Sequence, residues 1–194
     1  MDARTSTRDR IVQAAMELFW RKGYGSTSIA DILDTAQVNS GSLYYFFKGK
    51  QELLVAVLEA YREGIGPMLL EPSWGEVADP VEKIFALLGT YRRLVVETDC
   101  CYGCPIGSLA LELHEPDPEV RELIAANFAA WTGAVKQCLD QAGLANRTDT
   151  LALAELVLSV MEGGVMQTRT HRDIGHFDRA MAQLRCYLEC LKKG

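Results

Sequence analysis

The sequence has no run of about 18 uncharged apolar residues, which is the length that a membrane-spanning helix needs. Its first ten residues, MDARTSTRDR, are polar and lead directly into a helical pattern, without the apolar segment of a secretory signal. We therefore expect a cytoplasmic protein with no membrane partner. In that reducing compartment the six cysteines should be thiols and not a disulfide framework.

Sequence signatures of common enzymes are also absent. There is no glycine-rich nucleotide loop after a strand, no nucleophile elbow and no HExxH motif. A cysteine hydrolase would pair Cys104 with a histidine, but His114 lies about three helical turns further along the chain. We therefore expect no enzymatic activity.

Metal binding and cofactor binding are not predicted either. Cys101 and Cys104 have half of a zinc-site spacing, and Cys186 and Cys190 offer a second pair. Nothing in the sequence brings the two pairs together, and none of the three histidines has ligand spacing to them. We therefore predict no metal-binding residues and no cofactor.

Charge is distributed unevenly along the chain. The net charge of −6 argues against nucleic-acid binding when it is taken alone. Residues 1–50, however, hold seven Lys and Arg against five Asp and Glu, a balance of +2 that leaves −8 for the rest of the chain. A positive head on an acidic body is expected when only one end of a protein meets phosphate.

Apolar residues at helical spacing dominate the sequence, and no strand pattern or internal repeat is evident. Gly23 is the expected C-cap of the first helix, and Thr27 the expected N-cap of the second. Asn39 or Ser40 is the expected N-cap of the third. Three short helices with these connections form a helix-turn-helix unit. The four expected helices of this part cover residues 8–22, 28–35, 40–46 and 50–64.

The rest of the chain is also predicted to be helical. The segment 64–79 is rich in glycine and proline and is expected to connect two domains. We predict a helix-turn-helix domain over residues 1–50 and a second helical domain over residues 51–194. The helices expected after the connection cover residues 80–98, 105–114, 117–142, 149–170 and 177–192.

Residues 23–54, GYGSTSIADILDTAQVNSGSLYYFFKGKQELL, resemble the signature of the tetracycline-repressor (TetR) family. The close match covers the first fifty-odd residues, and the remainder agrees in length and helical layout. The resemblance implies an all-α fold, in which an N-terminal helix-turn-helix domain is followed by a helical ligand-binding and dimerisation domain. It also implies a homodimeric repressor that binds a palindromic operator in double-stranded DNA and is released by a small-molecule inducer.

Candidate phosphate contacts surround the expected third helix. Gly41 would let the helix backbone approach DNA closely. Ser42 and Thr27 offer hydroxyls at helix N-termini, where backbone amides and the helix dipole favour phosphate. The resemblance assigns a phosphate contact to Tyr45 and another to Lys50.

Candidate base contacts are Asn39, Ser40 and Ser42, because amide and hydroxyl groups form hydrogen bonds in the major groove. Family members often have Lys or Arg where Ser40 stands and His where Phe46 stands, which leaves the operator sequence open. Ser40 thus removes a charge at the start of the reading helix.

Tyr44 and Tyr45 are consecutive and project about 100° apart, so they cannot both lie in the core. Tyr44 is a candidate DNA-binding residue, but we favour a place in the tri-helical core for Tyr44 and Phe47. For Thr27, a capping role and a phosphate contact are both retained.

The last two helices are expected to form the dimer interface. The segment 149–170 is apolar almost all round, and Gly163 and Gly164 would allow close approach of another helix. The final helix carries one apolar stripe. The alternative is that these faces bury one another within a single subunit.

The inducer pocket is expected among the helices of the second domain. Aromatic residues at helical spacing more often form a core than a ligand site, so simple packing is the alternative for each. The candidate ligand-binding residues are Phe85, Tyr91, Cys104, Phe128 and Trp131.

Cys104 supports a second hypothesis. It precedes Pro105, a favoured first-turn residue, and a thiol at a helix N-terminus tends toward the reactive thiolate. The Gly-Cys-x-x-Gly run at 103–107 resembles a subgroup of TetR-type regulators that sense electrophiles or oxidants, with Cys100 or Cys101 as a resolving partner. The alternatives are an inert buried cysteine and a DNA-binding protein without any ligand. Repression and activation are not distinguished by the sequence.

Overall fold

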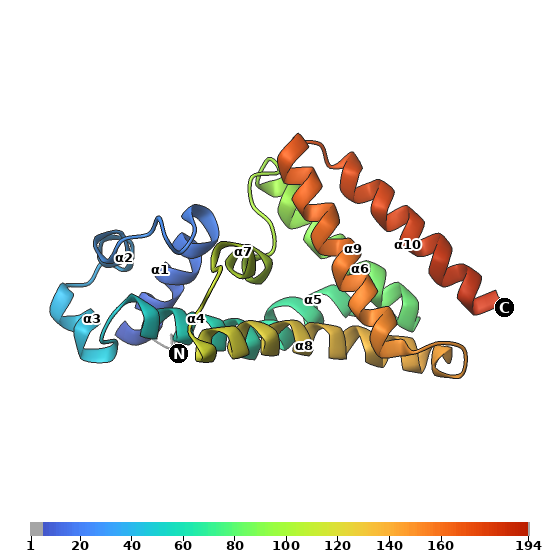
Figure 1. Cartoon of the computed structure of the whole chain (residues 1–194), viewed down its shortest axis with the longest axis horizontal. Helices are drawn as coiled ribbons and strands as arrows, with labels where there is room; N and C mark the ends of the chain where they lie inside the picture. The colour runs from blue at the N-terminus through green and yellow to red at the C-terminus, as the bar shows by residue number, and fades with distance from the viewer. Residues whose placement is uncertain (1–5, 194) are drawn as a thin grey trace. The chain divides into compact units, whose positions relative to one another are not determined.

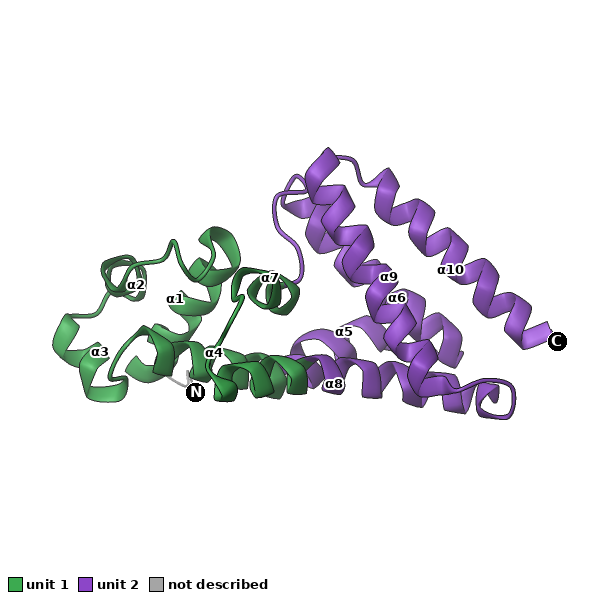
Figure 2. Cartoon of the chain, viewed as in Figure 1, with its two compact units in different colours: residues 1–63, 105–127 green, residues 64–104, 128–194 purple. Residues whose placement is uncertain are grey.

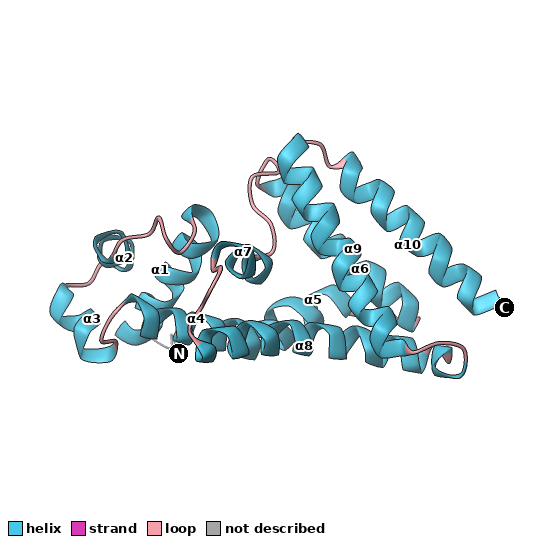
Figure 3. Cartoon of the chain, in the orientation of Figure 1, coloured by secondary structure: helices cyan, strands magenta, loops and turns pink. Residues whose placement is uncertain are grey.

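The computed structural model describes residues 6–193, which form helices and connecting loops without a strand in that range (Figures 1 and 3). The predicted all-α fold is confirmed. The helices are α1 (Thr7–Lys22), α2 (Ile29–Ala36), α3 (Ser40–Phe46), α4 (Lys50–Gly64), the π-helix η1 (Ile65–Leu70), α5 (Glu71–Trp74), α6 (Pro80–Glu97), α7 (Pro105–Glu112), α8 (Pro118–Gln141), the 3₁₀-helix η2 (Leu144–Asn146), α9 (Thr150–His171) and α10 (Gly175–Lys193).

Local capping explains where the first helices begin and end. Gly23 ends α1 with φ +85°, and its N–H donates to the carbonyl of Phe19 at 3.0 Å, as predicted. Asn39 caps α3, also as predicted. The expected cap of α2 is wrong: Ser28 and not Thr27 accepts the N–H of Asp31, at 3.1 Å. In return, the Asp31 carboxylate accepts a hydrogen bond from the Ser28 N–H, which completes a capping box.

The segment 64–79, which its glycines and prolines predicted to connect two domains, is itself largely helical. It forms η1 and α5 before Asp79 caps α6. Pro72 lies in the first turn of α5, and η1 runs into α5 without a break, because Leu70 and Glu71 keep helical backbone angles. The π-helical turns of η1 directly precede this proline, which has no N–H to donate.

The chain divides into two compact units (Figure 2). Unit 1 comprises residues 1–63 and 105–127, and unit 2 comprises residues 64–104 and 128–194. The predicted domains divide the chain only once, at residue 50. The structure instead assembles α7 and the start of α8 with the N-terminal helices, a contact that sequence order does not reveal.

The core of unit 1 holds α2 and α3 against α1. Ile11, Phe19, Ile32 and Leu43 are all fully buried there, and each side chain of this kind contributes about 1.5–3 kcal/mol by its burial. Asn127 on α8 adds a buried hydrogen bond, because its Nδ2 donates to the carbonyl of Leu58 on α4 at 3.0 Å.

The core of unit 2 is built on the contact between α9 and α10. A Cβ at Gly164 would lie 3.2 Å from the Phe177 ring, so glycine at this position permits the close approach of the two helices. Ion pairs between Arg92 and Asp178 at 2.7 Å and between Arg185 and Glu82 join α10 to α6. By length and composition alone α9 is also apolar enough to cross a membrane, a test that core helices of soluble proteins pass as well.

Candidate nucleic-acid interface and regulatory site

The side chains of α3 and of its C-cap, Phe47, lie in two directions. Leu43 and Phe47 point into the core of unit 1, and Phe47 confirms its predicted place there. Tyr45 is 82% exposed and Tyr44 55% exposed, so the core position favoured for Tyr44 is wrong. A helix of seven residues buries only one face, and Leu43 occupies that face, which turns the next two side chains outward.

The beginning of α3 is shaped by its cap. Asn39 Oδ1 accepts the Ser42 N–H at 2.8 Å and the Ser42 hydroxyl at 3.1 Å. The Asn39 amide keeps its NH₂ group for donation, and Ser40 is exposed. At Gly41, among the described residues, a Cβ would come within 4 Å of Asn39 Oδ1 alone, at 3.3 Å.

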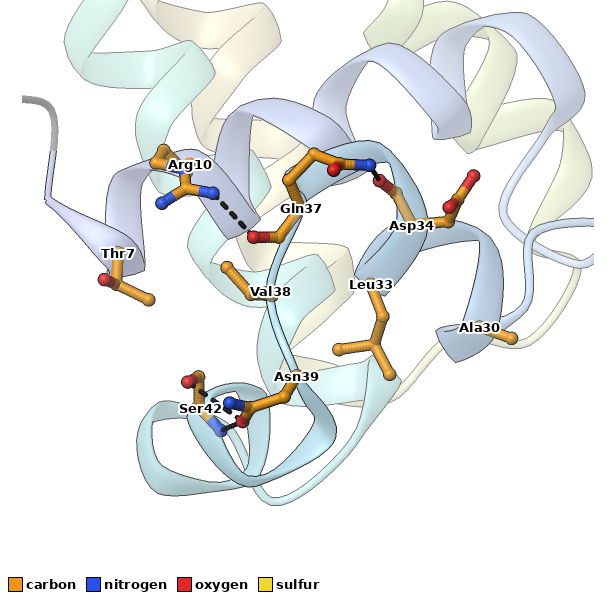
Figure 4. A pocket seen from close by; sticks show the side chains of 9 residues that line it. All are labelled: Thr7, Arg10, Ala30, Leu33, Asp34, Gln37, Val38, Asn39 and Ser42. Atoms are coloured by element: carbon orange, nitrogen blue, oxygen red, sulfur yellow. Dashed lines mark hydrogen bonds between the residues drawn. The ribbon is translucent and has the colours of Figure 1, made fainter.

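An open hollow of about 630 Å³ lies where α1, α2 and α3 meet (Figure 4). Arg10 crosses from α1 and donates to the carbonyls of Ala36 and Gln37 at the end of α2. Gln37 has left-handed backbone angles, and its side chain donates to the Asp34 carbonyl at 2.7 Å. These bonds fix the turn that sets the direction of α3. The hollow is lined by Thr7, Arg10, Ala30, Leu33, Asp34, Gln37, Val38, Asn39 and Ser42.

Thr27 and Lys50 both hold the turn between α1 and α2. The Thr27 side chain is 1% exposed, and its hydroxyl donates to the Gly23 carbonyl at 2.7 Å. Lys50 Nζ donates to the carbonyls of Tyr24 at 2.6 Å and Thr27 at 2.8 Å, and it lies 4.3 Å from the centre of the Tyr24 ring. Both residues therefore stabilise the turn between α1 and α2. Their phosphate contacts stay predictions.

Lys48 is a cation that the sequence analysis counted but did not place in the site. Its side chain, two residues after the end of α3, is 91% exposed, with Nζ 3.3 Å from Glu52 Oε1. The backbone N–H of Lys48 also donates to Glu52, and this bond is the main reason that the pKa of Glu52 lies below its usual range. The signal was the position of Lys48 immediately behind the expected reading helix.

In unit 2 three of the five predicted ligand residues come together. Tyr91 on α6 and Trp131 on α8 pack edge to face, with ring centres 6.4 Å apart. Cys104 joins them, and all three side chains are buried. Burial is the main cause that raises the pKa of Tyr91 well above its usual value, and the nearby Cys104 and Glu162 add to it.

Glu162 on α9 is the member of this cluster that the sequence analysis missed. Burial raises its pKa, while a hydrogen bond from Cys104 opposes the shift. It is the only charged residue between Leu156 and Thr168, and that isolation was a signal for a functional acid. We call Tyr91, Cys104, Trp131 and Glu162 the polar cluster.

Two buried polar atoms of the polar cluster have no hydrogen-bond partner within the described residues: Trp131 Nε1 and Glu162 Oε1. The Trp131 indole, whose ring packs against that of Tyr91, acts to lower the pKa of Tyr91, against the larger effect of burial. An unpaired buried polar group costs about 1–3 kcal/mol, so a partner for each atom would stabilise the site.

The other two predicted ligand residues lie differently. Phe85 lines a groove of about 340 Å³ between α6 and α10, with the Arg185 guanidinium 3.7 Å from its ring centre. Phe128 is half-buried on α8, one turn before Trp131. The structure therefore does not place Phe85 in the polar cluster.

Comparison with known proteins gives matches at both ends of the chain. Residues 11–57 match the family described as bacterial regulatory proteins, tetR family. Residues 80–183 match the C-terminal domain described as transcriptional regulator LmrA/YxaF-like.

Relatives cover nearly the whole length. The HTH-type transcriptional regulator YxaF of Bacillus subtilis is 30% identical over 174 residues, which is 89% of this chain and 90% of that protein. The HTH-type transcriptional repressor DhaR of Mycobacterium sp. is 25% identical over 88% of this chain and 86% of its own. The solved structure of a regulatory protein TetR from Rhodobacter sphaeroides has the same fold, with a TM-score of 0.83, 21% identity and coverage of 92% and 96%.

Proposed function

Because the chain belongs to the TetR family of bacterial transcriptional regulators, we propose that it is a cytoplasmic, homodimeric repressor released from its operator by a small-molecule inducer. DNA binding is supported by the exposed face of α3, which a hydrogen-bonded turn holds against α1 and α2 in a helix-turn-helix. The name of the relative DhaR, a transcriptional repressor, supports repression.

In this proposal α3 enters the major groove with its N-terminal end toward the bases. The Asn39 amide and the Ser40 hydroxyl are exposed there and reach base edges. Gly41 allows the close approach, because it has no side chain and Asn39 is its one neighbour in the described structure within 4 Å of a Cβ position. Tyr45 and Lys48 extend outward and contact phosphate on either side of the groove.

Dimerisation is proposed to use the outer faces of α9 and α10. Leu156 on α9 and Tyr187 on α10 are exposed although they are large and apolar. Of the two glycines in α9, Gly164 packs within the subunit, whereas a Cβ at Gly163 would meet nothing within 4 Å among residues 6–193. Gly163 is thus available for close approach of a second copy.

The polar cluster is the proposed inducer site. The Trp131 N–H needs an acceptor, and the unpaired Glu162 oxygen, when ionised, needs a donor. A hydroxyl group both accepts and donates, so it can satisfy either atom. We therefore expect an apolar inducer that carries at least one hydroxyl, and we expect carboxylates to bind poorly beside Glu162.

A thiol switch at Cys104 is the second candidate, favoured by the place of this residue in the same cluster. Its thiol is buried and donates a hydrogen bond to Glu162, and an ionised Glu162 would disfavour the thiolate. We therefore place reversible ligand binding ahead of covalent modification.

The experiment starts by selecting DNA from a random-sequence pool with the purified protein. Palindromes with half-sites about one helical turn apart, roughly 34–36 Å, are expected. Small molecules are then screened for release of the selected duplex, with Tyr91→Phe and Trp131→Phe as variants that keep DNA binding and lose the response.

Each alternative has its own outcome in this experiment. Release by a thiol electrophile, abolished in Cys104→Ser, would replace the reversible inducer with the thiol switch. Failure of every compound to release DNA would favour the ligand-independent protein. Failure to select any sequence would contradict the DNA-binding proposal.

A further inference from the structure

The carboxylate of Glu112, the last residue of α7, is bound by two successive backbone N–H groups of the turn between α1 and α2. Glu112 Oε2 accepts the Tyr24 N–H at 2.9 Å, and Oε1 accepts the Gly25 N–H at 2.6 Å. Paired amides of this kind form a concave site for an anion, and charge-assisted bonds are stronger than neutral ones. We call this arrangement of Glu112 with Tyr24 and Gly25 the Glu112 clamp.

The two glycines beside Tyr24 are adapted to this carboxylate. A Cβ at Gly23 would lie 2.9 Å from Glu112 Oε2, and one at Gly25 would lie 3.0 Å from Oε1. Apart from the adjoining residues, Glu112 Oε1 is the only heavy atom of the described part of the chain within 4 Å of a Cβ at Gly25. The carboxylate therefore approaches the backbone more closely than a side chain at either position would allow.

Lys50 binds the same turn through its backbone carbonyl groups. Lys50 Nζ donates to the Tyr24 carbonyl, while Glu112 holds the Tyr24 N–H. An anion and a cation thus fix one residue from both ends. Burial, followed by the charge of Glu112, raises the pKa of Tyr24, in agreement with a ring held close to this carboxylate.

The clamp joins segments that are far apart in the sequence. The turn leads within a few residues to Ser28, the cap of α2, and so helps to set the helix-turn-helix. Helix α7 begins directly after Cys104, a member of the polar cluster. A displacement of α7 would therefore move the Glu112 carboxylate away from the backbone amides of Tyr24 and Gly25.

We propose that Glu112 is a positioning residue through which α7 holds the α1–α2 turn in its DNA-binding conformation. The proposal rests on the proposed DNA-binding function and adds to it a route by which the regulatory part of the chain acts on the head. Glu112 does not itself contact DNA in this account.

The test compares the full-length wild type with Glu112→Gln and with Glu122→Gln, which removes the same charge from an exposed position on α8. Operator affinity is measured by fluorescence anisotropy on a duplex selected by the wild type, at a temperature where circular dichroism shows every variant folded. We expect Glu112→Gln to weaken binding about tenfold relative to Glu122→Gln, with the same salt dependence, since no phosphate contact is lost.

A double-mutant cycle with Gly25→Ala supplies the specific readout. The added methyl group collides with Glu112, so Gly25→Ala should weaken DNA binding in the wild type and have little further effect in Glu112→Ala. Native-state hydrogen exchange should show faster exchange of the Tyr24 and Gly25 amides in Glu112→Gln, but not in Glu122→Gln.

The outcomes separate this inference from the proposed function. If the wild type binds its selected duplex and the folded Glu112 variants bind it equally well, the clamp has no positioning role. Additive effects of Gly25→Ala and Glu112→Ala would overturn it as well. If the wild type itself selects no DNA, the proposed function fails first.

Discussion

Tyr45 shows how far one side chain can be followed from sequence to function. It follows Tyr44 in the chain, yet its greater exposure makes it the outermost aromatic residue of α3. The sequence established that the two tyrosines face different directions, but it did not establish that both avoid the core. Both tyrosines are exposed because Leu43 occupies the one buried face of α3. A helix of seven residues is too short to bury a second face.

Replacement of Tyr45 by Phe tests the predicted phosphate contact. A hydrogen bond to a charged group contributes about 1.5–3 kcal/mol, so Tyr45→Phe should reduce operator affinity about tenfold or more. The melting temperature should stay unchanged, because the lost hydroxyl is exposed. Anisotropy titration and thermal unfolding measure the two quantities. Tyr44→Phe is measured beside it, because Tyr44 is the other exposed tyrosine of α3. An unchanged operator affinity in Tyr45→Phe would contradict the predicted phosphate contact.

Glu162 gives a prediction for pH. Burial raises its pKa in the folded state, so the folded protein binds more protons than the unfolded chain between the ordinary pKa of Glu and the raised value. Stability contributed by this residue therefore falls as the pH rises through that window. Glu162→Gln should stabilise the protein more at pH 8 than at pH 5, as measured by urea unfolding. A gain that does not depend on pH would show that Glu162 titrates normally.

Helix boundaries were the most predictable part of the molecule. The helices after residue 79 and those of the head begin and end within a few residues of their expected positions, because caps and apolar spacing are local signals. Residues 64–79 were not predictable in this way, since their glycines and prolines are compatible with the helical turns of η1 and α5. The contacts of Glu112 and Glu162 could not be predicted from the sequence, because their partners lie in distant segments of the chain.

The capping box of α2 is predicted to support the head at neutral and mildly acidic pH. The backbone N–H of Ser28 is the main group that lowers the pKa of Asp31 to about 2. With a folded pKa below the ordinary value near 3.9, this contribution is complete above about pH 4 and is lost as the pH falls toward 2. The difference in unfolding free energy between wild type and Asp31→Asn should therefore shrink over this range.

Ser28→Ala tests the same helix end without altering charge. Loss of an N-cap serine costs about 1 kcal/mol, which chemical denaturation at pH 7 can resolve. The conservative variant Ser28→Thr should retain most of that stability, because the threonine hydroxyl also caps. Equal destabilisation by Ser28→Ala and Ser28→Thr would show that the hydroxyl is not the stabilising group.

At the scale of the whole molecule, the family confirms a DNA-binding transcriptional regulator and not an enzyme. The resemblance of residues 23–54 was sufficient for that prediction. The polar cluster was only partly predictable, because aromatic spacing identified Tyr91 and Trp131 but also pointed to Phe85, which lies in another groove.

The proposed dimer predicts the effect of a charge on the outer face of α9. Leu156→Glu should convert the protein to monomers in analytical ultracentrifugation and weaken operator binding about a hundredfold or more, since two linked heads bind far better than one. Leu151→Glu is the control: its exposure of 45% resembles the 42% of Leu156, but it projects about 140° away around the helix. A dimeric Leu156→Glu protein would place the interface elsewhere.

The most direct test of the central claim is the ratio of affinities for the selected palindrome and for a scrambled duplex of the same length, measured by anisotropy at physiological salt. A sequence-reading α3 predicts that the palindrome binds at least about a thousandfold more tightly, and that Asn39→Ala and Gly41→Ala reduce this ratio. Equal affinity for the two duplexes, with a steep salt dependence for both, would contradict a repressor that reads a specific operator.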